Sequence, residues 1–238
     1  MKNLTAVYIL AGCCVPAGFA AALLRNRHAE RGRLASKLLA SLLFCATALL
    51  AAAQRERMTL SAALLLGALL LGFIGDVLLG LDQFAPKQTR PILFILGGVP
   101  FFLGHILYIV LLLPIGNFSP WLLLLLPVVP ILFAALARAN VIYFGKNLVP
   151  CTLYGTILSA MMMSTLNVAR QGAALPQGAA LAHLMFLPGI LFALSDSSLF
   201  LRNFGGERLQ KWIPALSFTV MLPYYAAQAI FALSVRYI

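Results

Sequence analysis

Long runs of apolar residues, separated by short polar segments, extend along almost the whole chain. A helix needs about 20 apolar residues to cross the hydrocarbon core of a bilayer. Eight stretches reach that length, at 4–24, 34–53, 58–81, 91–114, 119–137, 148–168, 178–201 and 212–235. The strict alternation of membrane strands is absent, so these stretches predict helices. The sequence therefore predicts an all-α fold, a polytopic transmembrane helical bundle of about eight spans, with residues 1–238 as a single integral-membrane domain.

Composition and charge agree with a membrane protein. The chain is 62% apolar and 10% charged, far more apolar than a soluble domain of 238 residues requires. Its net charge of +11 comes from Lys and Arg scattered over short loops, with no aromatic-interleaved basic patch. We therefore expect membrane lipids and no nucleic acid as partners. The four cysteines lie in apolar runs without metal-ligand spacing, which is typical of reduced, packed thiols.

The basic residues predict an orientation for the bundle. The first, third, fifth and seventh loops carry twelve Lys and Arg residues, and the opposite side carries five. Lys37 is counted here as part of the first loop. The positive-inside rule then places the odd-numbered loops in the cytoplasm and both termini outside. In a bacterial host, the membrane would be the inner or plasma membrane.

Two aspartates interrupt the apolar runs. Asp76 lies in the third span and Asp196 in the seventh, each roughly 8 Å inside the span end on the same predicted side. A charged side chain at the centre of a bilayer costs roughly 2.5 kcal/mol or more, so such residues usually mark a function. One interpretation is a polar clamp between helices. The other, which we adopt, is a catalytic acid–base pair in which burial keeps one carboxyl protonated while the other ionises.

Further polar side chains lie deeper, roughly 20 Å from that same side. They are His105 on the fourth span and Tyr224, Tyr225 and Gln228 on the eighth. Tyr108 shares a helix face with His105 because it follows three residues later. These groups are either interhelical hydrogen bonders or ligands for a polar headgroup, in one cavity that opens to the cytoplasmic leaflet. A zinc site is not expected, because only one of the three histidines lies deep with the aspartates.

Three blocks of residues resemble a known family. They cover most of the chain from the third span onward: Gly75-Asp76 with Leu79, Gly97, Phe101, His105 and Tyr108; the segment 150–163; and Gly189, Phe192, Ser195-Asp196, Leu199 and Asn203-Phe204, followed by Tyr224, Tyr225 and Gln228. With these blocks the chain resembles the YhhN-like lysoplasmalogenase family of eight-span membrane proteins.

The resemblance implies hydrolysis of the vinyl ether bond of lysoplasmalogens to a fatty aldehyde and a glycerophospho-choline or -ethanolamine, without a cofactor. It implies catalytic roles for Asp76 and Asp196. A lysophospholipid substrate would contact supporting positions, for which we name His105, Tyr108, Ser195, Tyr224, Tyr225 and Gln228. Its phosphate would face basic residues near the cytoplasmic ends of the spans, with Lys87, Arg90 and Arg202 as candidates.

Two other classes of function stay open at this point. A small transporter or lipid flippase would use the aspartates as proton or substrate sites. A purely structural membrane protein would use them only as interhelical contacts. Release of aldehyde in detergent distinguishes a hydrolase from both. The sequence contains no G-x-S-x-G elbow, P-loop, H-E-x-x-H or dinucleotide fingerprint, which disfavours serine hydrolase chemistry.

Overall fold

The computed structural model describes residues 4–86, 88–117, 119–176 and 178–238. Within these ranges, seven helical stretches are long and apolar enough to cross a membrane, and no strand is formed. The helices that make them are α1 (Leu4–Asn26), α2 (Glu30–Ala53), α3 (Leu60–Leu81), α4 (Arg90–Gly116), α6 (Leu148–Gln171), the pair α7 (Ala179–Phe186) and α8 (Pro188–Phe204), and α9 (Ile213–Ser234). The predicted all-α, polytopic helical bundle is confirmed.

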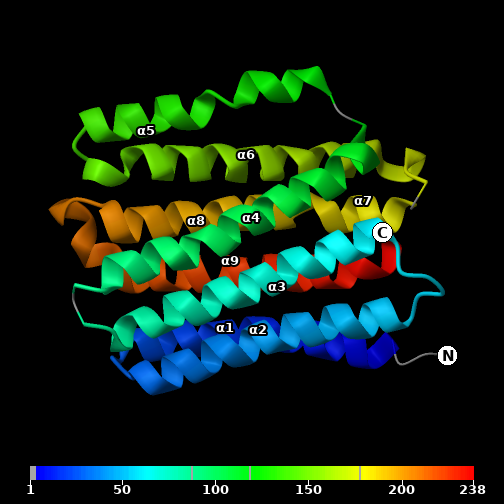
Figure 1. Ribbon diagram of the computed structural model, residues 1–238, viewed down its shortest axis with the longest axis horizontal. Coiled ribbons are helices and arrows are strands. Elements are labelled where there is room, and N and C mark those ends of the chain that lie inside the picture. The colour runs from blue at the N-terminus through cyan, green and yellow to red at the C-terminus, as the bar shows by residue number, and fades with distance from the viewer. Residues whose placement is uncertain (1–3, 87, 118, 177) are drawn as a thin grey trace.

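The fifth candidate span is not one continuous helix. A 3-10 helix at Pro120–Leu125 is followed by α5 (Val128–Arg138), which has 11 residues. Pro127 occupies the N-cap of α5. Proline has no backbone N–H and disfavours helix at the preceding residue, so it interrupts the ladder here. In Figure 1 the two segments nevertheless follow one another along α6, and the chain passes from one end of the bundle to the other.

The seventh candidate span is also divided. Helix α7 ends at Phe186, and Pro188 begins α8 at a position where a missing N–H is tolerated. The two helices continue along the same side of the bundle, so together they form one apolar stretch from Ala179 to Phe204. Asp196 lies in the longer second part, away from the break.

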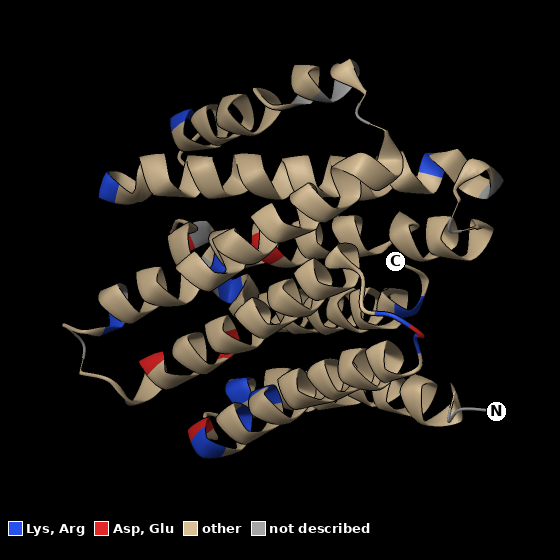
Figure 2. Cartoon of the chain, turned by 45° about the vertical axis from the view of Figure 1, so that its right-hand side comes forward, with Lys and Arg blue, Asp and Glu red and all other residues tan. Residues whose placement is uncertain are grey.

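The helices run side by side with alternating direction (Figure 1). The α1–α2, α3–α4, α5–α6 and α8–α9 connections lie at one end of the bundle, and both marked termini lie at the other. Figure 2 shows most charged residues toward the two ends, with long tan stretches between them. The protein is therefore built as an integral multi-pass membrane protein. The cytoplasmic assignment of the basic loops and the single-domain interpretation stay predictions.

Helix α9 occupies the centre of the bundle. Its apolar window is 67% buried, compared with 33–44% for the other six spans among the described residues. It packs mainly on α8, α1 and α2, and more lightly on α3 and α7. Any polar group on α9 is therefore surrounded by other helices, and Tyr224, Tyr225 and Gln228 are all buried there.

Glycine allows two of the helices to approach closely. Gly189 on α8 faces α6, where an added Cβ would meet Thr165 Oγ1 and lie 2.8 Å from Met162 Cα. Because the second contact is backbone, it cannot move aside as a flexible side chain would. We expect Gly189→Ala to lower the free energy of unfolding by about 1–2 kcal/mol, as overpacking outweighs the helix preference of alanine.

The measurement is thermal unfolding in detergent, with Gly98→Ala as the matched control. Gly98 is also inside a helix, and a Cβ there would have nothing within 4 Å. The control should be neutral or slightly stabilising, by up to about 1 kcal/mol. Equal melting temperatures for the two variants would contradict close α6–α8 packing at Gly189.

Candidate functional site

Asp76 is held by donors from two other helices. Lys37 Nζ on α2 lies 3.1 Å from its Oδ1. The Ser41 hydroxyl, also on α2, donates to Oδ2 at 2.6 Å, and the Tyr224 hydroxyl on α9 donates to the same oxygen at 2.8 Å. Tyr225 OH lies at the limit of hydrogen bonding, 3.5 Å from Oδ2. The side chain of Asp76 is buried, and these contacts suit an ionised carboxylate, which only accepts hydrogen bonds.

The assignment of Lys37 to the first loop was wrong. Helix α2 begins at Glu30, so Lys37 lies well inside it, with a side chain only 4% exposed. Lys37 and Ser41 are one turn apart and share a helix face, which places both toward Asp76. Two charges buried together are tolerated only when they compensate each other, so this lysine belongs to the site and not to the orientation signal.

Asp196 has different neighbours. Tyr154 on α6 donates its hydroxyl to Oδ2 at 2.8 Å, and His105 Nε2 on α4 lies 3.4 Å from the same oxygen. His105 Nε2 and the Tyr154 hydroxyl are 3.2 Å apart, so each of the three side chains lies within hydrogen-bonding distance of the other two. No Lys or Arg among the described residues forms an ion pair with Asp196. Unlike Asp76, Asp196 is therefore held by a tyrosine and a histidine and by no Lys or Arg of the described chain.

Both aspartates line one cavity. It has a volume of about 80 Å³, enough for a few water molecules, since one water takes up roughly 30 Å³ in the liquid. Apolar side chains (Leu79, Phe94, Phe101, Leu199, Val220 and Met221) share its wall with polar and charged ones (Arg25, Arg33, Lys37, Asp76, Asp82, Tyr154, Ser195, Asp196, Arg202, Asn203 and Tyr224). Two carboxyl groups of unlike surroundings, a water-sized space and an apolar wall are the elements of an acid–base site for an amphipathic substrate.

The expected supporting residues fall into two groups. Tyr224 and Ser195 line the cavity with the aspartates, although the Ser195 hydroxyl donates to the Val220 carbonyl at 2.8 Å. His105 and Tyr225 do not line it but reach the aspartates from behind. The structure thus places four of the predicted residues around the two carboxyls. Their substrate-binding roles stay predictions.

Tyr108 and Gln228 lie one step further out. The Tyr108 hydroxyl donates to Gln228 Oε1 at 2.9 Å, and Gln228 Nε2 donates to the Tyr224 hydroxyl at 3.1 Å. Neither lines the cavity. Tyr108 also stacks on Phe231, with ring centroids 4.0 Å apart. This chain orients the Tyr224 hydroxyl toward Asp76, so the geometry gives the two residues a positioning role in place of direct contact with a ligand.

The three basic residues that we named as candidates for phosphate contact also differ in their position relative to the cavity. Lys87 lies outside the described residues. Arg90 donates to the carbonyls of Ala85 and Gln83 and does not line the cavity. Only Arg202 does. Sequence reasoning missed Arg25, Arg33 and the direct contact of Tyr154. The available signal was that Tyr154, Ser159, Ser164 and Asn167 make the stretch 148–168 more polar than the other predicted spans.

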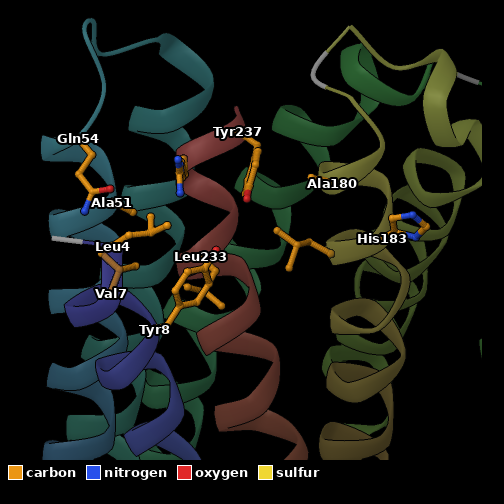
Figure 3. Close-up of a pocket in the computed structure, with 11 residues that line it drawn as sticks. Leu4, Val7, Tyr8, Ala51, Gln54, Ala180, His183, Leu233 and Tyr237 are labelled. Carbon is orange, nitrogen blue, oxygen red and sulfur yellow. The ribbon is translucent and has the colours of Figure 1, made fainter. Parts of the chain in front are cut away.

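A second cavity lies toward the opposite end of the bundle, between α1, α2, α7 and α9 (Figure 3). Its volume is about 250 Å³, and it is lined mostly by apolar residues with Tyr8, His183, Arg236 and Tyr237. No Asp or Glu is among its described lining residues, so it has no acid–base pair. Across the described chain, no three His, Cys, Asp or Glu side chains gather as a metal site requires.

The buried ion pair should dominate the stability of this region. We expect Lys37→Met to lower the free energy of unfolding by about 3–5 kcal/mol, because Asp76 would keep its charge without a compensating partner. Adding Asp76→Asn in the same chain should restore part of the loss. Thermal unfolding in detergent gives the values, with the exposed Lys146→Met as control. Additive effects of the two substitutions would show that the residues are not coupled.

Comparison with known proteins gives one match. The model of the YhhN family matches residues 32–235. The matched region contains both aspartates and every helix from α3 to α9. No curated protein and no solved structure matches the chain.

Proposed function

The chain belongs to the YhhN family, and on that premise we propose that it is a membrane hydrolase that cleaves the vinyl ether bond of lysoplasmalogens. The observation that supports this proposal most directly is the single cavity lined by two buried carboxyls with unlike partners. Vinyl ether hydrolysis needs an acid that protonates carbon and a base that assists water. One aspartate supplies each function.

Asp196 is the proposed acid. Tyr154 and His105 both contact its Oδ2, and no described residue hydrogen-bonds to Oδ1. We place the transferable proton on Oδ1, the oxygen that the protein leaves available to a substrate. Nδ1 of His105 is buried without a hydrogen-bond partner among the described residues, which suits a neutral ring protonated on Nε2. The proton of Asp196 adds to the outer carbon of the vinyl ether, and the double-bond electrons form the new C–H bond.

Asp76 is the proposed base and stabilising anion. Protonation of the substrate leaves an oxocarbenium ion, which a fixed carboxylate stabilises. Water adds to the carbon bonded to the ether oxygen and gives a proton to Asp76. As the hemiacetal breaks its bond to the glycerol oxygen, Asp76 gives its proton to that oxygen, which leaves as the alcohol. The hemiacetal hydroxyl gives its proton to Asp196, which restores both carboxyls to their starting states. The products are the fatty aldehyde and the glycerophospho-base, and one water is consumed.

The wall of the cavity suits the two parts of the substrate. Leu79, Phe101 and Leu199 offer apolar surface for the start of the alkenyl chain. Arg25, Arg33 and Arg202 of the lining come from the helix ends at the side of the basic loops. We propose that this side faces the cytoplasm, so that the lysolipid would enter from the inner leaflet.

Loss of either carboxyl should abolish the reaction. We expect Asp76→Asn and Asp196→Asn each to lower aldehyde release from lysoplasmenyl-ethanolamine or -choline in detergent by about a hundredfold or more. Glu56→Gln makes the same chemical change at an exposed residue and should leave the rate unchanged. Asp196→Asn and Glu56→Gln need melting curves close to wild type, and Asp76→Asn, which leaves Lys37 without its partner, is assayed well below its own melting temperature. No aldehyde from folded wild-type protein would overturn the proposal and favour a transport role.

Isotope labelling tests which bond is broken. If water adds to the alkenyl carbon, hydrolysis in oxygen-18 water should leave the glycerophospho-base unlabelled, because its oxygen was the ether oxygen. In deuterated water the aldehyde should gain one deuterium, at the carbon that received the proton. Mass spectrometry of both products reads the outcome. Oxygen-18 in the glycerophospho-base would mean attack at glycerol and would exclude carbon protonation by Asp196 as the first step.

A further inference from the structure

Three arginines meet at the cavity although they are far apart in the sequence. Arg25 lies at the end of α1, Arg33 in the first turns of α2, and Arg202 near the end of α8. All three line the cavity that holds the aspartates. The positive charges of Arg25 and Arg33 and the negative charge of Asp82 all act on Arg202, so these groups lie near one another. Asp82 and Glu30 supply two negative charges against three positive ones, so a further anionic group would stabilise the cluster.

The arginines are only partly satisfied by the protein. Nε and Nη1 of Arg202 and Nε of Arg33 are buried without a hydrogen-bond partner among the described residues. Arg33 Nη1 donates to Gln83 at 2.7 Å and lies 3.6 Å from Glu30. Asp82 lines the same cavity but lies beyond 4.0 Å from all three arginines in the described structure. Buried N–H donors left unpaired are costly, so these donors point to a ligand.

We propose that Arg25, Arg33 and Arg202 form a binding site for the phosphate group of a phosphate ester. A guanidinium presents planar, paired donors that match phosphate oxygens, and it keeps its charge when partly buried. A phosphodiester carries one negative charge and several acceptors. It would offset the mutual repulsion of the arginines and pair with the donors that the protein leaves open.

The register of the helices supports this site, and this step rests on the proposed function. Arg33 precedes Lys37 by four residues, and Arg202 follows Asp196 by six, so both lie toward the same end of the bundle. At 1.5 Å per residue the arginine layer is roughly 6–9 Å from the carboxyl layer. In a lysoplasmalogen, six bonds separate phosphorus from the first vinyl carbon, which is roughly 7.5 Å when extended, because a zigzag chain advances only about 1.25 Å per bond. Phosphate on the arginines therefore places the vinyl ether beside the aspartates.

Binding without turnover tests the site. The protein is held in a phosphate-free sugar detergent and titrated with lysophosphatidylcholine, whose ester tail has no vinyl ether to cleave. The other arms are inorganic phosphate and a monoacylglycerol, which has the tail but no phosphate. Arg202→Gln and Arg25→Gln should each weaken lysophosphatidylcholine binding about tenfold or more and leave monoacylglycerol binding unchanged. Arg90→Gln, the same charge change outside the cavity, is the matched control.

The arms separate the outcomes. Arginine-dependent binding of inorganic phosphate supports the site with free phosphate as its ligand, and arginine-dependent binding of the lysolipid alone supports a lipid headgroup. Wild-type affinity in both folded variants, or an equal loss in Arg90→Gln, overturns the proposal. Because aldehyde release is not the measurement, a protein that binds phosphate but shows no hydrolysis would retain this site and lose the proposed reaction.

Discussion

The ion pair between Lys37 and Asp76 is the contact on which the arrangement of the bundle depends most. Each buried ion costs several kcal/mol of desolvation, and only close, hydrogen-bonded partners recover it. The partners come from α2, α3 and α9, so these three helices must meet at one depth. Around Asp196, α4, α6 and α8 meet in the same way. Two polar clusters, each joining three helices, therefore fix the positions of these helices along the bundle axis. An apolar interface alone would allow the helices to slide past one another.

The two polar clusters are connected to each other by side-chain contacts at the centre of the molecule. Tyr108 on α4 contacts Gln228 on α9, which contacts the Tyr224 hydroxyl that donates to Asp76. The ring of Phe192 packs against His105 and against Tyr224, with centroids 5.1 and 5.6 Å apart. A change near one aspartate therefore has a physical route to the other. The unlike surroundings of the two carboxyls, a lysine for one and a histidine for the other, are the basis of the separate acid and base roles that we propose for them.

Hydropathy alone predicted the helices and singled out both aspartates, because a carboxylate inside an apolar run is conspicuous in any single sequence. It failed where tertiary structure decides. Lys37 lies at the edge of an apolar run, where a lysine is normally assigned to a loop. Its place inside α2 becomes clear only when its partner, Asp76, is known. The break at Pro127 could not be predicted from the presence of a proline, because Pro16, Pro100 and Pro223 lie inside continuous helices. Tyr154 and Arg33 were overlooked because the rotation of a helix, which turns a side chain inward or outward, is set by its neighbours.

The rotation of the helices also decides whether a basic residue belongs to the cavity or to the orientation signal. Four of the twelve Lys and Arg residues that gave the positive-inside signal, Arg25, Arg33, Lys37 and Arg202, line the cavity. The contact with Asp76 and the proposed phosphate site account for their presence, whatever the orientation of the protein. Without these four residues, the odd-numbered loops carry eight Lys and Arg residues and the opposite side carries five. The charge difference that predicts the orientation is then much smaller. The site and the orientation signal draw on the same charges. Cysteine labelling of the loops in intact cells would therefore establish the topology and the leaflet from which the proposed lipid substrate enters. This result does not depend on the mechanism of the site.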